Sequence, residues 1–255
     1  MFAGGENQLS GARFSGMANA SVSLSDPWCT FHNQAGLGFL KKPVAAIYYG
    51  NPFLVSQLSV KSGTFALPIK AGTFGLSFSD FGYSLYKENR IGLAFAKAFG
   101  ENISAGIQMD YMHFAIGEEY GSRSAIVAEM GIQARVWKGL TIGAHIYNPT
   151  MTKLADYNDE RIPTTMRLGA DFKFSDKVLL AVETEKNIDQ KADLRAGIEY
   201  RIIKELYLRA GFATNPSLSC FGIGLELKKF KLDLSSTYHA TLGFSPQIGM
   251  TYDFK

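Results

Sequence analysis

The last quarter of the chain, residues 191–255, reads KADLRAGIEYRIIKELYLRAGFATNPSLSCFGIGLELKKFKLDLSSTYHATLGFSPQIGMTYDFK. It contains five short runs in which apolar and polar residues alternate, and only brief turns separate them. In the first run every even-numbered residue from Ala192 to Ile202 is apolar, and the intervening residues are Asp193, Arg195, Gly197, Glu199 and Arg201. Alternation with a period of two predicts strands whose two faces meet different surroundings.

The repetition of this pattern decides the fold class. No following segment offers the helices or the second sheet that would cover so many apolar faces in water. A closed barrel in a bilayer places the apolar faces against lipid and the polar faces in the lumen. We therefore predict an all-β fold, a 14-stranded antiparallel transmembrane β-barrel, with strands near 44–53, 58–69, 73–83, 90–99, 103–117, 124–137, 140–149, 164–174, 178–186, 191–202, 206–213, 218–228, 232–239 and 244–254.

The connections between these strands alternate in length, which predicts an orientation. Tight turns follow every second strand, and the intervening connections are mostly longer, the longest being Thr150 to Pro163. Outer-membrane barrels have short periplasmic turns and longer outer loops. With an even number of strands, both termini of the chain would then lie on the periplasmic side of a bacterial outer membrane or in the lumen. The outer loops are nevertheless short for a general porin.

Composition excludes several classes of protein. Charged residues make up 19% of the chain, and the net charge of +3 comes from dispersed basic residues, so we expect no nucleic-acid partner. The sequence contains no run of about 18 apolar residues, so it predicts no transmembrane helix. The expected partners are the lipid bilayer and its lipopolysaccharide, together with other outer-membrane, periplasmic or surface proteins. A soluble all-β protein remains the alternative, because no signal peptide precedes the barrel. A barrel of this type must be exported, so we expect that its signal peptide is absent from this chain.

Residues that could carry chemistry are scattered. The four histidines lie in separate segments, and no Gly-x-Ser-x-Gly or Cys-x-x-Cys pattern occurs. We therefore expect no enzyme activity, no cofactor and no metal site, and interpret the histidines as lumen or interface residues. The two cysteines, Cys29 and Cys220, could form one long-range disulfide or remain free thiols, and the sequence leaves both alternatives open.

Residues 1–43 do not alternate and are rich in small residues. We expect a loop-rich hatch or plug segment inside the lumen of the barrel formed by residues 44–255, with one short helix near Ala12 to Ala20. Within the segment, residues 11–39 read GARFSGMANASVSLSDPWCTFHNQAGLGF. This stretch resembles the opening of the PorV/PorQ family of Bacteroidota, a branch of the FadL-like barrels, with Gln34 in place of the family's proline. The residues that match its hatch motif are Ala12, Arg13, Gly16, Met17, Asn33, Ala35, Gly36 and Leu37.

The resemblance implies two kinds of function. PorV and PorQ act in type IX secretion, as a carrier of secreted substrates and as a membrane anchor, whereas FadL passes hydrophobic molecules through its hatch and a lateral opening. Our first hypothesis is a non-enzymatic barrel, plugged by its N-terminus, that serves as a scaffold or partner subunit of an envelope assembly. The alternative is a FadL-like passive channel for small hydrophobic molecules. The channel would need an apolar pocket between hatch and wall, lined by Phe14, Met17, Trp28, Phe31, Met112 and Phe114.

Inward-facing charges of both signs favour the scaffold hypothesis, because a selective ion pore is lined predominantly by one sign. We expect these charges to form ion pairs that brace the wall or hold residues 1–43, with Arg13 and Asp26 as partners from the hatch. The expected lumen network consists of Glu129, Arg135, Arg167, Asp171, Glu183, Asp193, Arg195, Glu199 and Arg201.

Overall fold

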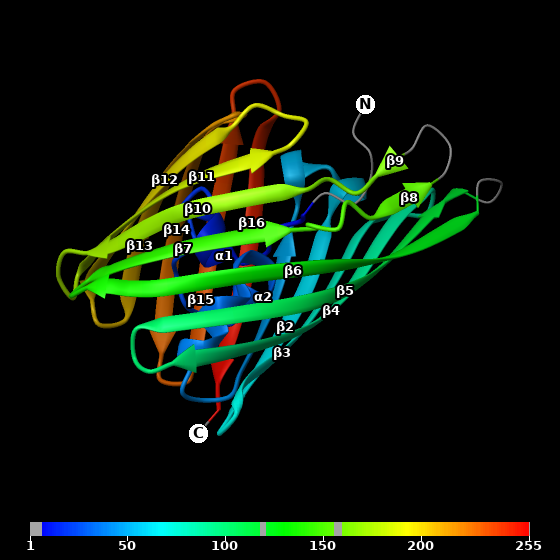
Figure 1. The fold of residues 1–255 in the computed structure, drawn as a ribbon. Coiled ribbons are helices and arrows are strands. Elements are labelled where there is room, and N and C mark those ends of the chain that lie inside the picture. The colour runs from blue at the N-terminus through cyan, green and yellow to red at the C-terminus, as the bar shows by residue number, and fades with distance from the viewer. Residues whose placement is uncertain (1–6, 118–120, 156–159, 255) are drawn as a thin grey trace.

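The computed structural model describes residues 7–117, 121–155 and 160–254. The chain forms one closed barrel in which each wall strand pairs antiparallel with its neighbours in the sequence, and β1 closes on β16 (Figure 1). The wall strands are β1 (Val44–Gly50), β2 (Val60–Ile69), β3 (Gly72–Tyr83), β4 (Tyr86–Phe99), β5 (Ile103–Ile116), β6 (Ser122–Trp137), β7 (Leu140–Tyr147), β10 (Thr165–Lys173), β11 (Val178–Asn187), β12 (Asp193–Ile203), β13 (Leu206–Thr214), β14 (Ser217–Leu227), β15 (Phe230–His239) and β16 (Gly243–Asp253).

These are the fourteen antiparallel strands that the alternation predicts, with boundaries shifted by a few residues. The largest shift is in β4, which begins at Tyr86 rather than at residue 90, because residues 86–89 pair with 113–116 of β5. The connections at 70–71, 100–102, 138–139, 174–177, 204–205 and 228–229 define what we call the short-turn end. The opposite end is the long-loop end.

The connection between β7 and β10 contains a feature that the sequence did not predict. Two further strands, β8 (Lys153–Ala155) and β9 (Glu160–Arg161), pair as a separate hairpin in this connection. Strands of two or three residues are too short to show a periodic pattern. The predicted connections Thr150 to Pro163 and Glu118 to Arg123 lie partly outside the described residues.

The two faces of the wall differ as the alternation predicts. On β4 and β5 the outward residues Leu93 and Ile107 are 62% and 61% exposed, whereas the inward Arg90 and Asp110 are 4% and 0% exposed. Large apolar side chains cover the outer face of every wall strand, and polar and small residues face inward.

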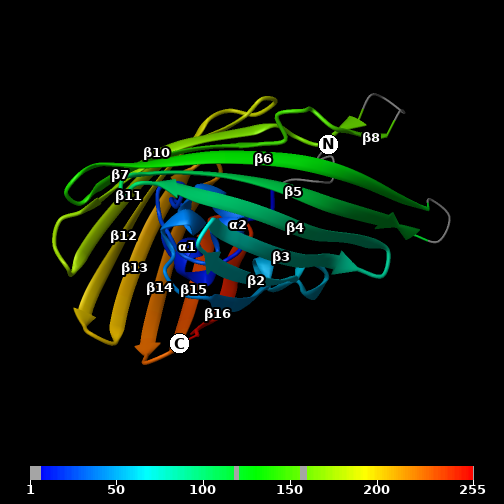
Figure 2. The ribbon, with the colours of Figure 1, turned by 60° about the horizontal axis from the view of Figure 1, so that its bottom comes forward.

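The N-terminal segment, residues 7–43, lies inside the barrel. Figures 1 and 2 both show its helices α1 (Ala12–Ser15) and α2 (Cys29–His32) surrounded by the wall. A 3₁₀ helix, η1 (Gln34–Phe39), packs against β4, β5 and β6, and α1 packs against β14, β15 and β16. The helix predicted near residues 12–20 is therefore present but ends at Ser15. No helix among the described residues has the length or apolar character needed to cross a membrane.

Candidate functional site

The contact between the N-terminal segment and the inner wall is built on glycines of the wall. A Cβ atom added at Gly211 would lie 2.5 Å from the backbone of Met17 and Ala18, and one at Gly197 would lie 2.6 Å from Met17 Cβ. Real Cβ atoms do not approach other heavy atoms this closely. The wall therefore lacks side chains where the segment's backbone comes nearest.

The residues that match the hatch motif face such glycines. Gly16 packs against Gly222, where an added Cβ would lie 3.3 Å from Gly16 Cα. An added Cβ would come closer than 3.0 Å in four other sets of neighbours: Met17 with Gly197 and Gly211, Asn33 with Gly131, Ala35 with Gly106, and Leu37 with Gly75. Ala12 lies beside Gly249 at an ordinary contact distance of 3.4 Å. These contacts of six of the eight motif residues are spread over seven wall strands, from β3 to β16, so the structure distributes the motif around the lumen.

Among the polar contacts that connect the segment to the wall, three are centred on a glutamate of the wall, and we call them clamps. The first joins Arg13 to Glu199 of β12, with Arg13 Nε and Nη2 each 2.9 Å from one carboxylate oxygen. Arg13 Nη1 also lies 3.3 Å from Asp26 of the segment. On the wall side, Arg209 contacts Glu199 and Asp233, each at 2.7 Å. Arg13 thus completes a chain of alternating charges.

The second clamp centres on Glu183 of β11. One of its carboxylate oxygens accepts the backbone N–H groups of Ser21 and Val22, both at 2.8 Å, and the other accepts Arg167 Nε at 2.6 Å. Arg167 also donates to the backbone oxygens of Asn19 and His32. Glu183 and Arg167 have no exposed side-chain surface. Two buried charges of opposite sign are therefore satisfied by each other and by the backbone of the segment.

The third clamp includes residues that the predicted network did not contain. Arg90 of β4 forms ion pairs with Asp110 and with Glu129, and Glu129 also accepts Nε2 of His145 at 2.9 Å. From the segment, Gln34 donates its Nε2 to Glu129 at 2.7 Å. Arg90 was not included in the predicted network, because its strand was expected to begin at this residue. Arg90 nevertheless alternates with the outward Ile91 and lies on the same face as Gly92, which indicates an inward position.

The remaining predicted network residues lie outside the three clamps, except that Arg195 reaches Glu183 of the second clamp at 3.8 Å. Arg195 donates to Glu185 at 2.8 Å and to Asp193 at 2.7 Å, near the long-loop end. The others lie toward the short-turn end: Arg135 covers the ring of Phe39 at 3.8 Å, Arg201 donates to the backbone oxygen of Lys204, and Asp171 is buried.

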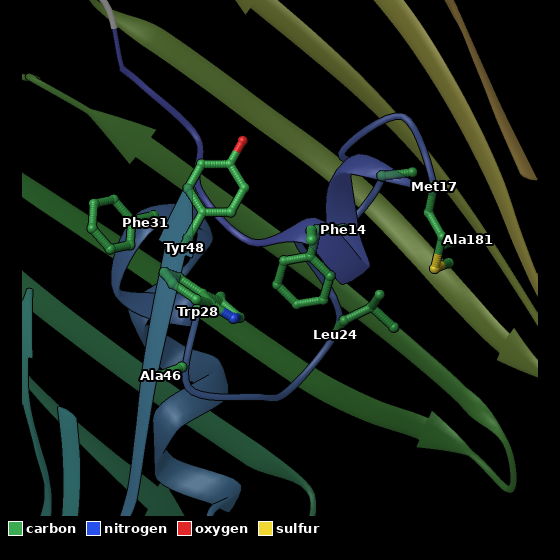
Figure 3. Close-up of a cluster of buried hydrophobic side chains, with 10 residues drawn as sticks. Phe14, Met17, Leu24, Trp28, Phe31, Ala46, Tyr48 and Ala181 are labelled. Carbon is green, nitrogen blue, oxygen red and sulfur yellow. The ribbon is translucent and has the colours of Figure 1, made fainter. Parts of the chain in front are cut away.

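Apolar residues of the segment pack into a continuous cluster with the wall. Phe14 and Phe31 are fully buried and Trp28 is 2% exposed, and Trp28 lies against Tyr48 of β1 with ring centroids 5.8 Å apart (Figure 3). Met17 belongs to the same cluster, whereas Met112 and Phe114 do not. These two belong to a second inner cluster near the long-loop end, with Ala125, Val127, Tyr147 and Ile162. The structure therefore divides the residues expected to line one pocket between two packed clusters.

A cavity lies between the segment and the wall on the short-turn side of Arg13. It has a volume of about 190 Å³ and is lined by Arg13, Asp26 and Trp28 of the segment and by Glu199, Arg209 and Asp233 of the wall, among others. Seven of its thirteen lining residues are charged. Both cysteines are free and buried, Cys29 in the segment and Cys220 in β14.

Comparison with known proteins shows which fold this is. No protein-family model and no curated protein matches the sequence. Among solved structures, a FadL homologue from Pseudomonas aeruginosa is similar over 99% of this chain and 100% of its own, with a TM-score of 0.70 at 14% identity. The toluene transporter TbuX of Ralstonia pickettii is similar over 96% and 98% of the two chains, with a TM-score of 0.72 at 11% identity.

A mutant of the monoaromatic hydrocarbon channel TodX is similar over 99% of this chain and 100% of its own, with a TM-score of 0.74 at 10% identity. At such identities the likeness shows the fold. The chain has the closed 14-stranded antiparallel architecture of the FadL-like barrels. These three structures are a FadL homologue, a toluene transporter and a hydrocarbon channel.

Proposed function

We propose that this chain is an outer-membrane channel of the FadL type, which passes small hydrophobic molecules and is closed at rest by its own N-terminal segment. The observation that carries the proposal is the way in which the segment is held. It fills the lumen of a FadL-like barrel, yet it is fastened to the wall by non-covalent clamps at Glu199, Glu183 and Glu129. Such an element can move without unfolding the barrel.

The outer wall supports a location in the outer membrane. Exposed large apolar residues occur on every strand and include Ile47, Leu93, Ile107, Leu168 and Phe221, each more than half exposed. A continuous apolar surface of this kind would be costly in water and is the normal lipid-facing surface of a barrel. With the short turns on the periplasmic side, the end of β16 at Asp253 lies at that side, and Gln8, near the described start of the N-terminal segment, lies in the lumen.

The second inner cluster supports hydrophobic cargo. Met112, Phe114 and Val127 point into the barrel at its long-loop end, where the wall of an aqueous pore would carry polar side chains. Ile162 of the long β7–β10 connection covers them. A small apolar molecule that displaces this cover would enter an apolar environment. TbuX is a toluene transporter and TodX a monoaromatic hydrocarbon channel, and we propose the same chemical class of cargo here.

A reversible lock of the segment tests the proposal. Ser10 Oγ of the segment lies 2.8 Å from Ser62 Oγ of β2, so the double variant Ser10→Cys/Ser62→Cys can form a disulfide across this contact. We expect cells that express the wild-type channel to take up radiolabelled toluene faster than cells without it. The oxidised double variant should lose this excess uptake, and a reductant should restore it.

The single variants Ser10→Cys and Ser62→Cys are the matched controls and should respond to neither oxidant nor reductant. Uptake that stays at the background level for the wild-type protein would reject a hydrocarbon channel. Excess uptake that persists in the oxidised double variant would reject the segment as the gate.

The second candidate is the scaffold, a PorV/PorQ-like partner subunit of a secretion or assembly complex. The dense packing of the lumen favours it, because Phe14, Trp28 and Phe31 leave no open apolar pocket among themselves. The comparison structures favour the channel instead. Gentle detergent extraction followed by native mass measurement tests the scaffold, for which we expect a stable complex with another envelope protein. A lone monomer in several detergents would reject it.

A further inference from the structure

Lysines are distributed around the whole short-turn end of the barrel. Five of its six turns contain one or more lysines, and Lys97 lies on the outward face of β4 beside the sixth turn. The residues on which the argument rests are Lys70, Lys97, Lys138, Lys177, Lys204 and Lys229, and we call them the lysine collar. All are exposed except Lys229, which is half-buried.

The charges of the lysine collar are not compensated by the protein. Among the described residues, no ion pair with a carboxylate involves any of its six members, whereas the lumen arginines Arg90, Arg167 and Arg209 are all paired. Two other lysines at the same end, Lys173 and Lys231, pair with Asp176 at 2.9 Å and with Asp253 at 3.2 Å, and we do not count them in the collar. The collar therefore concentrates unpaired positive charge at one rim of a molecule whose net charge is only +3.

Exposed aromatic residues accompany the lysines on the lipid side. Trp137, next to Lys138, is 78% exposed, and Phe99 and Phe174 are 58% and 62% exposed. Lys229 Nζ lies 5.9 Å from the centre of the Tyr252 ring. Aromatic rings of membrane proteins sit at the level of the lipid headgroups, and lysines beyond them extend their ammonium groups toward the phosphates.

We propose that the lysine collar binds anionic phospholipids, such as phosphatidylglycerol, in the leaflet that surrounds the short-turn end. The distribution of the collar identifies the occupant. A partner protein would dock on one side, whereas these lysines occur in five of the six turns and beside the sixth, around the circumference, as a ring of lipid does. The proposal is independent of whether the lumen conducts.

Tryptophan fluorescence provides a local test. The chain has two tryptophans, of which Trp28 is buried in the lumen and Trp137 is exposed beside the collar. The protein is reconstituted in mixed liposomes in which either phosphatidylglycerol or phosphatidylcholine carries brominated acyl chains, which quench a tryptophan that they contact. The variant Trp137→Phe supplies the background from Trp28.

We expect phosphatidylglycerol to compete for the position beside Trp137 about threefold to fivefold better than phosphatidylcholine, as one lysine near an anionic surface provides. The preference should shrink in high salt. Substitution of Lys70, Lys138, Lys204 and Lys229 by Gln should abolish it. The matched control substitutes Lys61, Lys87, Lys186 and Lys191 at the long-loop end by Gln, and it should retain the preference.

Equal quenching by the two lipids, or equal loss in the two quadruple variants, would overturn the proposal. A second experiment distinguishes phospholipid from the phosphates of lipopolysaccharide in the outer leaflet. The variant Lys138→Cys is treated in intact cells with a maleimide that cannot cross membranes. No labelling is expected at the periplasmic face, and rapid labelling would place the collar outside and overturn the assignment to phospholipid.

Discussion

Arg13 and Glu199, which are 186 residues apart in the sequence, form a two-pronged ion pair inside the barrel, with both nitrogen–oxygen distances at 2.9 Å. This pair joins the N-terminal segment to the centre of the β12 strand. Glu199 is held from the other side by Arg209 at 2.7 Å. The carboxylate is therefore an anchor of the wall, to which the segment adds one removable arginine.

Removal of that arginine should loosen the segment without destroying the wall. We expect Arg13→Ala to lower the free energy of unfolding by about 2 kcal/mol, less than a fully orphaned buried charge would cost, because Glu199 keeps Arg209 and Asp26 keeps the backbone N–H of Trp28. Denaturant titration in detergent micelles measures the change. As a control, Lys173→Ala removes the exposed pair with Asp176 and should leave stability unchanged. An equal effect of both substitutions would show that the Arg13 pair does not hold the segment.

The clamp at Glu183 should lose more stability on substitution than the clamp between Arg13 and Glu199. Because one carboxylate oxygen accepts two backbone N–H groups and the other accepts Arg167, the variant Glu183→Gln must turn an amide NH₂ toward one set of donors. We expect a loss of about 3 kcal/mol in the free energy of unfolding. Glu185→Gln is the matched control, because Glu185 is partly exposed and should tolerate the change better. A larger loss for Glu185→Gln would contradict this account.

The barrel could be predicted from the sequence because the alternation of faces is local information. Each strand carries its own pattern, such as Phe221 and Ile223 outward against Gly222 and Gly224 inward. Fourteen such strands in succession predict a single closed barrel. The hairpin of β8 and β9 was missed since strands of two or three residues carry no periodicity.

The interior could be predicted only in outline. Alternation marks Glu129 as inward, but it does not show that Arg90 and Gln34 reach it. The Arg90 contact crosses β5, from β4 to β6, and the Gln34 contact depends on the path of the segment. In the same way, Phe14 and Met112 were expected to line one pocket, and the structure places them in separate clusters. Which aromatic residues meet inside a barrel is set by three-dimensional packing, not by spacing in the sequence.

The rate at which the Cys29 thiol is labelled should show when the N-terminal segment leaves the lumen. Burial raises the pKa of the Cys29 thiol well above its usual range, so the thiol is protonated at neutral pH as well as inaccessible. In the Cys220→Ser variant we expect slow labelling of Cys29 by maleimide at pH 7 to 8. In the double variant Cys220→Ser/Arg13→Ala we expect labelling of Cys29 to be at least tenfold faster. The rate is followed by mass spectrometry. Rapid labelling of the Cys220→Ser protein itself would mean that the segment is not held in the lumen.

The wall glycines in closest contact with the N-terminal segment should be the positions where the smallest substitution displaces it. A Cβ at Gly211 would lie 2.5 Å from the backbone of Met17 and Ala18, and backbone atoms cannot yield as a flexible side chain can. We expect Gly211→Ala to lower the free energy of unfolding by about 1–3 kcal/mol, as overpacking does, and to accelerate proteolysis within residues 11–24. Gly249→Ala is the matched inward control, because its Cβ would lie 3.4 Å from Ala12 Cβ, an ordinary contact, and its proteolysis should match the wild type. If Gly211→Ala also behaves as wild type, the segment and β13 must shift apart at little cost, and the wall glycines would not fix its position.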